Sequence, residues 1–127
     1  MTSAALLLSL AALDPTVAAV NAERARRALP PLASSVVLER SSDRFADRLA
    51  RSGRFAHDAR IRVDGGRFSA LGEALARGDG LSPADAVRAW MDSPPHRRLV
   101  LSPRYTHVGA GAARAGGTTI RVLHLAR

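Results

Sequence analysis

Three side chains from separate segments have the chemistry of a metal or acid–base site. They are His57, which ends the motif Phe55-Ala56-His57, Glu73, which follows Gly72, and His96, which follows a Pro-Pro pair. Neutral imidazole binds zinc-like ions well, and a catalytic zinc site needs about three protein ligands and one open position. Two histidines and one glutamate would meet that number. Alternatively, Glu73 would act as a general base on water, or would fix the tautomer of a histidine.

Asp92 and Ser93, just before the Pro-Pro pair, are further candidates for lining such a site. Asp92 can also be read as a charge at a helix end. Ser93 fits the N-cap of a following helix, since no His–Asp arrangement marks it as a nucleophile. His107 and His124 fall on expected strands outside these motifs, so we do not expect them to be ligands.

The elements that must position these residues are mainly helices in the first three quarters of the chain. Cap residues and helical spacing of apolar residues predict four helices. These helices run from Asp14-Pro15 to about Leu29, from Ser34 or Ser35 to Gly53, from Ser82 to Pro94, and from Ser93 to about Leu101. We also expect a short strand over residues 59–63 and a short helical piece over residues 72–76.

The end of the chain has the pattern of a β-hairpin. Val108 begins a Gly-punctuated strand, Gly116-Gly117 forms the turn, and Thr118 begins the return strand. Ile120 and Val122 share a face with His124. Helices followed by a hairpin predict an α+β fold, in which a small antiparallel sheet is covered by helices.

Composition indicates one domain, over residues 14–127, with a strong positive charge. The 127 residues carry a net charge of +8, contain no cysteine and no lysine, and have only 4% aromatic residues. The charge suggests an anionic partner such as lipid or nucleic acid. The simpler explanation is codon usage in a GC-rich genome, which raises the content of Arg and Ala together. The scarcity of aromatic residues makes nucleic acid an unlikely partner.

The first 13 residues have two interpretations. Their apolar run resembles the core of a signal peptide but lacks a preceding positive charge. The run is too short to span a bilayer, so we expect no transmembrane segment. The alternative is a first helical segment that packs on the domain.

Four motifs in order resemble the bacterial, SCP-like branch of the CAP superfamily (cysteine-rich secretory proteins, antigen 5 and pathogenesis-related 1). They are the helix around Asn21-Ala22-Glu23-Arg24, Phe55-Ala56-His57 with Gly72-Glu73, Ala89-Trp90-Met91-Asp92-Ser93-Pro94-Pro95-His96, and Tyr105-Thr106-His107-Val108-Gly109. The resemblance covers about residues 15–113. It implies an α-β-α sandwich with an open cleft, in which His57 and His96 are the metal-binding histidines and Glu73 is the first of two glutamates. Ser93 stands at the position of the second glutamate.

The resemblance predicts a secreted or extracytoplasmic binding module that lacks enzymatic activity or has little. Its cleft would hold a divalent cation, for which zinc is the first candidate, through His57 and His96. Glu73, Asp92 and Ser93 would line the cleft. The ligand would be a small molecule, a lipid or a cell-wall component. A metal-assisted hydrolase of peptide or cell-wall polymer, with Glu73 as base, is the first alternative. A charge-driven binder of anionic lipid or nucleic acid is the second.

Overall fold

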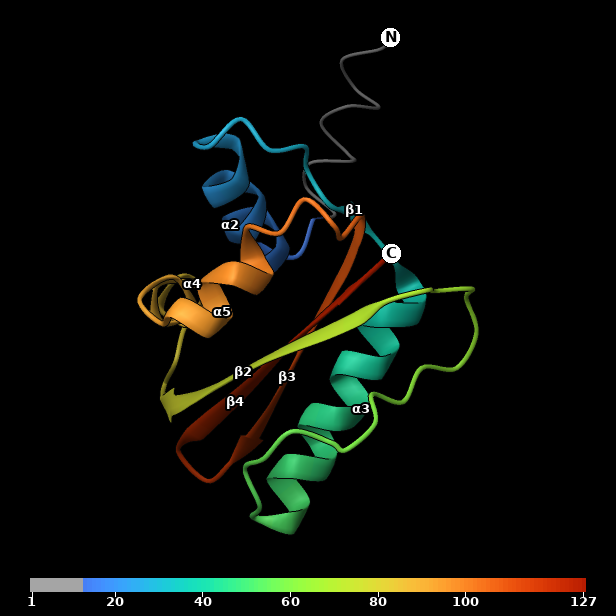
Figure 1. The fold of residues 1–127 in the computed structure, drawn as a ribbon. Helices are drawn as coiled ribbons and strands as arrows, with labels where there is room; N and C mark the ends of the chain where they lie inside the picture. Colours follow the sequence, from blue (N-terminus) through green and yellow to red (C-terminus); the bar gives the residue numbers. More distant parts are fainter. Residues whose placement is uncertain (1–12) are drawn as a thin grey trace, which may run out of the picture.

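The middle layer of the molecule is a four-stranded sheet (Figure 1). The computed structural model describes residues 13–127, and its strands follow the order β1-β3-β4-β2. They are β1 (Ala33–Ser34), β2 (Leu71–Asp79), β3 (His107–Ala115) and β4 (Thr118–Ala126). β1 runs parallel to β3, and the other neighbours are antiparallel. The hairpin expected at the end of the chain is confirmed as β3 and β4.

Helices cover both faces of the sheet. They are α2 (Pro15–Ala25), α3 (Val36–Ser52), α4 (Pro83–Met91) and α5 (Pro94–Val100). Figure 1 shows α3 alone on one face, while α2, α4 and α5 gather on the other. The fold is therefore an α-β-α sandwich, as expected.

Helix α3 starts and stops where the sequence predicts. The hydroxyl of Ser35 accepts a hydrogen bond from the Leu38 amide, and Gly53 ends the helix in the left-handed conformation at φ 68°. The helix lies directly on β3. The approach is so close that a Cβ atom added at Gly109 would overlap the α3 backbone at Leu38 and Glu39. The side of α3 that faces the sheet is mainly apolar, and it also carries two buried serines, Ser41 and Ser42.

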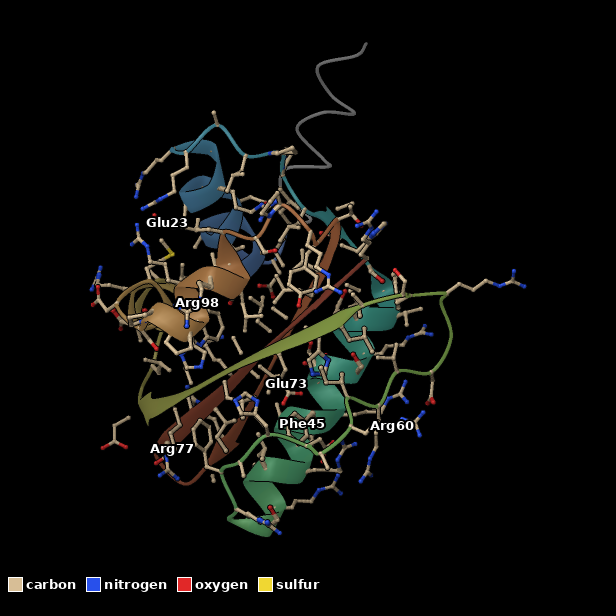
Figure 2. The ribbon with its side chains drawn as sticks, in the orientation of Figure 1. Glu23, Phe45, Arg60, Glu73, Arg77 and Arg98 are labelled. Carbon is tan, nitrogen blue, oxygen red and sulfur yellow. The ribbon has the colours of Figure 1, made fainter. Side chains whose placement is uncertain are left out.

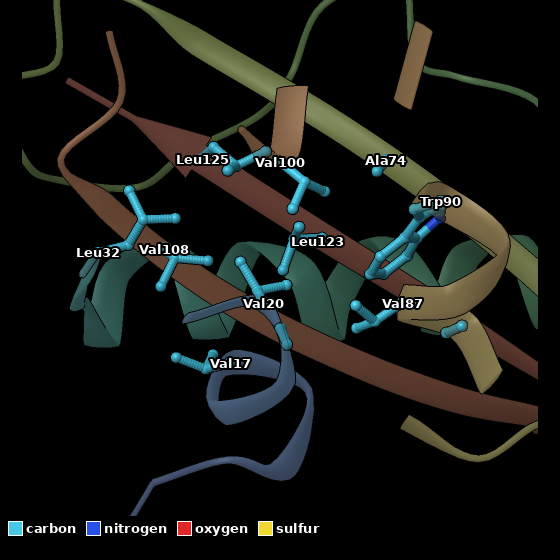
Figure 3. Close-up of a cluster of buried hydrophobic side chains, with 12 residues drawn as sticks. Val17, Val20, Leu32, Ala74, Val87, Trp90, Val100, Val108, Leu123 and Leu125 are labelled. Carbon is cyan, nitrogen blue, oxygen red and sulfur yellow. The ribbon is translucent and has the colours of Figure 1, made fainter. Parts of the chain in front are cut away.

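Two apolar clusters separate the layers. The larger one lies between the sheet and helices α2, α4 and α5, around Val20, Trp90 and Leu123 (Figure 3). The smaller one lies between the sheet and α3, and includes Phe45 and Val122. Burial of this apolar surface is the main force that holds the helices to the sheet.

Three local expectations were wrong. Residues 72–76, expected to be helical, belong to β2, and residues 59–63 form no strand. Nine paired positions with β4 outweigh the helical preference of the Glu and Ala residues in β2. Helix α2 ends at Ala25 instead of Leu29, because Ala28 takes the left-handed conformation at φ 56° and the amides of Ala28 and Leu29 donate back to the carbonyls of Ala25 and Arg24.

The segment expected to be signal-like or helical, residues 1–13, lies outside the described residues except for Leu13. Within residues 13–127, no helix is long and apolar enough to cross a bilayer.

Candidate functional site

Glu73 lies near the start of β2, on the face of the sheet that α3 covers. It is paired across the sheet with His124 of β4, which is paired in turn with Gly109 of β3. The Glu73 side chain is only 4% exposed. Figure 2 shows it pointing toward α3, with Phe45 beside it. A buried carboxylate at such a position needs hydrogen-bond donors.

Two histidines supply those donors. Nδ1 of His57 lies 2.9 Å from Oε1 of Glu73, and Nε2 of His124 lies 2.7 Å from Oε2. An ionised carboxylate only accepts hydrogen bonds, so His57 carries a proton on Nδ1. In neutral His57 the other nitrogen, Nε2, therefore keeps a free lone pair. The side chain of His57 is 55% exposed, so the ring is open to solvent.

His96 supplies a second imidazole. It lies in the first turn of α5, and its Nδ1 is 3.0 Å from the hydroxyl of Ser93. Ser93 holds the N-cap position, but its hydroxyl binds this ring and not a backbone amide of the helix. Burial lowers the pKa of His96, and the nearby His57 lowers it further. The two rings are thus close enough for their charges to interact, and the neutral form of His96 is favoured.

Four of the five candidate residues form hydrogen bonds in pairs, His57 with Glu73 and Ser93 with His96. Asp92 forms no such bond within the described part of the chain. Asp92 is exposed at the C-terminus of α4, and within residues 13–127 its carboxylate has no hydrogen-bond partner. In that part of the chain, no three His, Cys, Asp or Glu side chains are grouped as a metal site. The donor set is therefore two imidazoles, with Glu73 behind one of them.

His124 and Ser41 are the residues that sequence reasoning missed. His124 is 1% exposed, and its Nδ1 lies 2.7 Å from the Ser41 hydroxyl on α3. The signal was present, because a histidine that shares a strand face with Ile120 and Val122 must be buried and hydrogen-bonded. Ser41, His124 and Glu73 have the residue types of a hydrolase triad. Because Ser41 is 4% exposed and His124 1%, no substrate reaches them, and they act as a structural support.

Comparisons with known proteins identify the family. The family model described as "Cysteine-rich secretory protein family" (CAP) matches residues 17–124. The chain belongs to the CAP family. A curated relative, the uncharacterized protein YkwD of Bacillus subtilis, is 30% identical over 104 residues. That match covers 76% of this chain and 40% of YkwD, so the chain spans less than half the length of this relative.

Solved structures of other proteins share the fold. An outer surface protein of Borrelia burgdorferi matches with a TM-score of 0.77 and 18% identity, over 87% of this chain and 88% of that one. An extracellular SCP-domain protein of Bacillus anthracis matches with a TM-score of 0.75 and 21% identity, over 85% of this chain and 37% of that one. At sequence identities this low, the similarity shows a shared α-β-α fold and nothing more.

Proposed function

We propose that this CAP domain is an extracytoplasmic binding module whose cleft binds a divalent cation through Nε2 of His57 and Nε2 of His96. One observation carries the proposal: each histidine is held at Nδ1, by Glu73 or by Ser93. Holding one nitrogen leaves the other for a ligand. Imidazole donors favour zinc over magnesium or calcium. When bound, the ion would supply a Lewis-acidic position for an oxygen of the module's ligand.

Glu73 supports binding better than hydrolysis. A metal-assisted hydrolase needs a base that can take a proton from water. Both oxygens of Glu73 already accept hydrogen bonds from imidazoles, and the side chain is almost fully buried. We therefore assign Glu73 a positioning role, in which it selects the His57 tautomer that can bind a cation.

Calorimetric titration with zinc chloride tests this proposal. We expect the His57→Ala and His96→Ala variants each to lose at least about tenfold in affinity, and Glu73→Gln, which keeps both imidazoles, to lose about 10–100-fold. His107→Ala is the matched control, because the Nδ1 of His107 binds the neighbouring Thr106 and the ring lies beside Phe68. Equal zinc affinity in the wild type and in both alanine variants of the proposed pair would rule the site out.

The extracytoplasmic location is supported by the relatives. The matched protein of Bacillus anthracis is described as extracellular, and that of Borrelia burgdorferi as an outer surface protein. Fractionation of cells that express the full-length protein should place it at the surface or in the medium. Recovery in the cytosolic fraction alone would contradict this part of the proposal.

A further inference from the structure

A cavity beside His57 has features that the cation site does not use. It lies between α3 and the segment 54–62 and has a volume of about 370 Å³. This size is at the lower end of the range of about 300–1,000 Å³ for small-molecule sites. His57 is the only residue of the proposed cation site that lines it. The cavity is therefore a neighbouring pocket, which we name the arginine pocket after its lining residues Arg48, Arg54 and Arg62.

The wall of the arginine pocket carries more positive than negative charge. Its only carboxylate is that of Asp58, whose Oδ2 lies 3.0 Å from Nη2 of Arg48 and 3.7 Å from Nε of Arg62. One carboxylate is thus shared between two guanidinium groups. Arg54 takes part in none of the ion pairs found among residues 13–127. Guanidinium groups bind carboxylate and phosphate oxygens through two parallel hydrogen bonds, so the pocket is suited to an anion.

The floor of the pocket is apolar. Phe45 and Leu49 of α3 line it and are each 4% exposed, and Ala56 and Ala59 line its other side. The Arg48 guanidinium lies over the Phe45 ring at 5.1 Å from the centroid, which holds that charge at the edge of the apolar surface. An apolar floor with a cationic rim matches a ligand that has both an apolar part and an anionic group.

The segment that closes the pocket is fastened to the domain. Phe55 packs against the apolar cluster under α3, and the Arg77 guanidinium lies 4.6 Å from the centroid of its ring. The Arg48–Asp58 ion pair joins the segment to α3. These contacts on both sides hold the walls in place before a ligand arrives, which lowers the entropic cost of binding.

We propose that the arginine pocket binds a small organic anion, a carboxylate or phosphate monoester joined to a short apolar group. Arg54, which lacks an acidic partner among residues 13–127, and Arg62 bind the anionic group, while Phe45 and Leu49 contact the apolar part. The site goes beyond the proposed cation site and needs no metal. Three of the arginines that contribute to the net charge of +8 thus line one cavity, where they can act on the same ligand.

Calorimetry on chelator-treated, metal-free protein tests this proposal. Phenyl phosphate and benzoate, which carry the two kinds of anionic group, are compared with inorganic phosphate and with neutral benzyl alcohol. We expect saturable binding of at least one aromatic anion, weaker binding of inorganic phosphate, and none of benzyl alcohol. Which aromatic anion binds more tightly identifies the preferred group. Absence of saturable binding for both aromatic anions overturns the proposal, and inorganic phosphate binding as tightly as phenyl phosphate overturns the role of the apolar floor.

Variants separate the pocket from the overall charge. Arg54→Gln should weaken binding of the preferred anion by about tenfold, because one charge-assisted contact is lost. Arg40→Gln is the matched control, since Arg40 is exposed on α3 and does not line the cavity. Equal losses in both variants would mean that net charge alone attracts the anion. His96→Ala should lose zinc affinity but keep anion binding, so failure of the cation site and failure of the arginine pocket give different results.

Discussion

Ser93 gives His96 a different kind of support from the one that Glu73 gives His57. A carboxylate only accepts, so Glu73 fixes the proton of His57 on Nδ1. A hydroxyl both donates and accepts, so the contact between Ser93 and Nδ1 of His96 is compatible with either neutral tautomer. The resemblance to CAP proteins places a second glutamate where this chain has Ser93. The chain therefore has one histidine with a fixed tautomer and one that can adapt to its ligand.

The pKa of His96 tests whether the rings of His57 and His96 interact. Burial and the charge of His57 both lower the pKa of His96. We therefore expect His57→Ala to raise it, since the variant removes one positive neighbour and admits water. NMR titration of the His96 ring measures the shift, and His107→Ala should leave it unchanged. An unchanged or lower His96 midpoint in His57→Ala would show that the rings do not interact.

The same shift has a defined sign for stability. The pKa of folded His96 lies below the unfolded value of about 6.5, so the unfolded chain binds more protons as the pH falls through that value. The contribution of His96 therefore destabilises the fold as the pH falls below about 6.5, and has no effect well above it. The loss should be smaller in His57→Ala, because its His96 pKa is closer to the unfolded value. Urea denaturation of both proteins across this pH range measures the difference.

At the scale of elements, the contact between α3 and β3 sets the position of the buried support beneath Glu73. Gly109 and Gly111 lie so close to α3 that a Cβ at either would overlap its backbone, at Leu38 or Ser42. The Ser42 hydroxyl donates to the Gly109 carbonyl at 3.0 Å, and the neighbouring Ser41 binds His124. Glycine on the strand and serine on the helix therefore let the two elements approach each other.

Gly109→Ala should separate α3 from the sheet. The added methyl group meets backbone atoms, which cannot rotate away, so we expect a loss of about 1–3 kcal/mol or more in the free energy of unfolding. Gly117→Ala is the control, because nothing lies within 4 Å of a Cβ there and its φ is not in the left-handed region. Urea denaturation measures both variants. Equal stability of the two would contradict the close packing of α3 on β3.

Local signals predicted α3 and the final hairpin, but not β2. The caps of α3 at Ser35 and Gly53 are short-range features that the sequence displays directly. β2 depends on pairing with β4, which lies far along the chain, and its Glu and Ala residues suit a helix just as well. The candidate site follows the same division. His57, Glu73 and Ser93 lie in short motifs that the sequence displays directly, so they could be predicted. The contact of Glu73 with His124 depends on the register of β2 against β4, so it could not.

At the scale of the whole molecule, Arg24 ties two helices of one layer together. Its side chain is 1% exposed, and its Nη1 donates to the carbonyls of Val100 and Ser102, both at 2.9 Å. Its Nε donates to the Pro30 carbonyl, also at 2.9 Å. Burial lowers the pKa of Arg24, but a guanidinium stays charged at neutral pH. One residue of α2 thus holds the C-terminal end of α5, whose first turn carries His96.

Arg24→Lys should weaken both the fold and the cation site. An ammonium group cannot reproduce the spread of a planar guanidinium, so at least one of the three carbonyls loses its donor, at a cost of about 1–3 kcal/mol. Looser attachment of α5 should also lower zinc affinity through His96. Urea denaturation and zinc titration measure the two effects. Arg26→Lys, in the exposed pair with Glu23, should stay within about 0.5 kcal/mol of the wild type. If Arg24→Lys is as stable as Arg26→Lys, the carbonyls of α5 do not depend on the guanidinium, and α5 must be held to the sandwich by its apolar contacts alone.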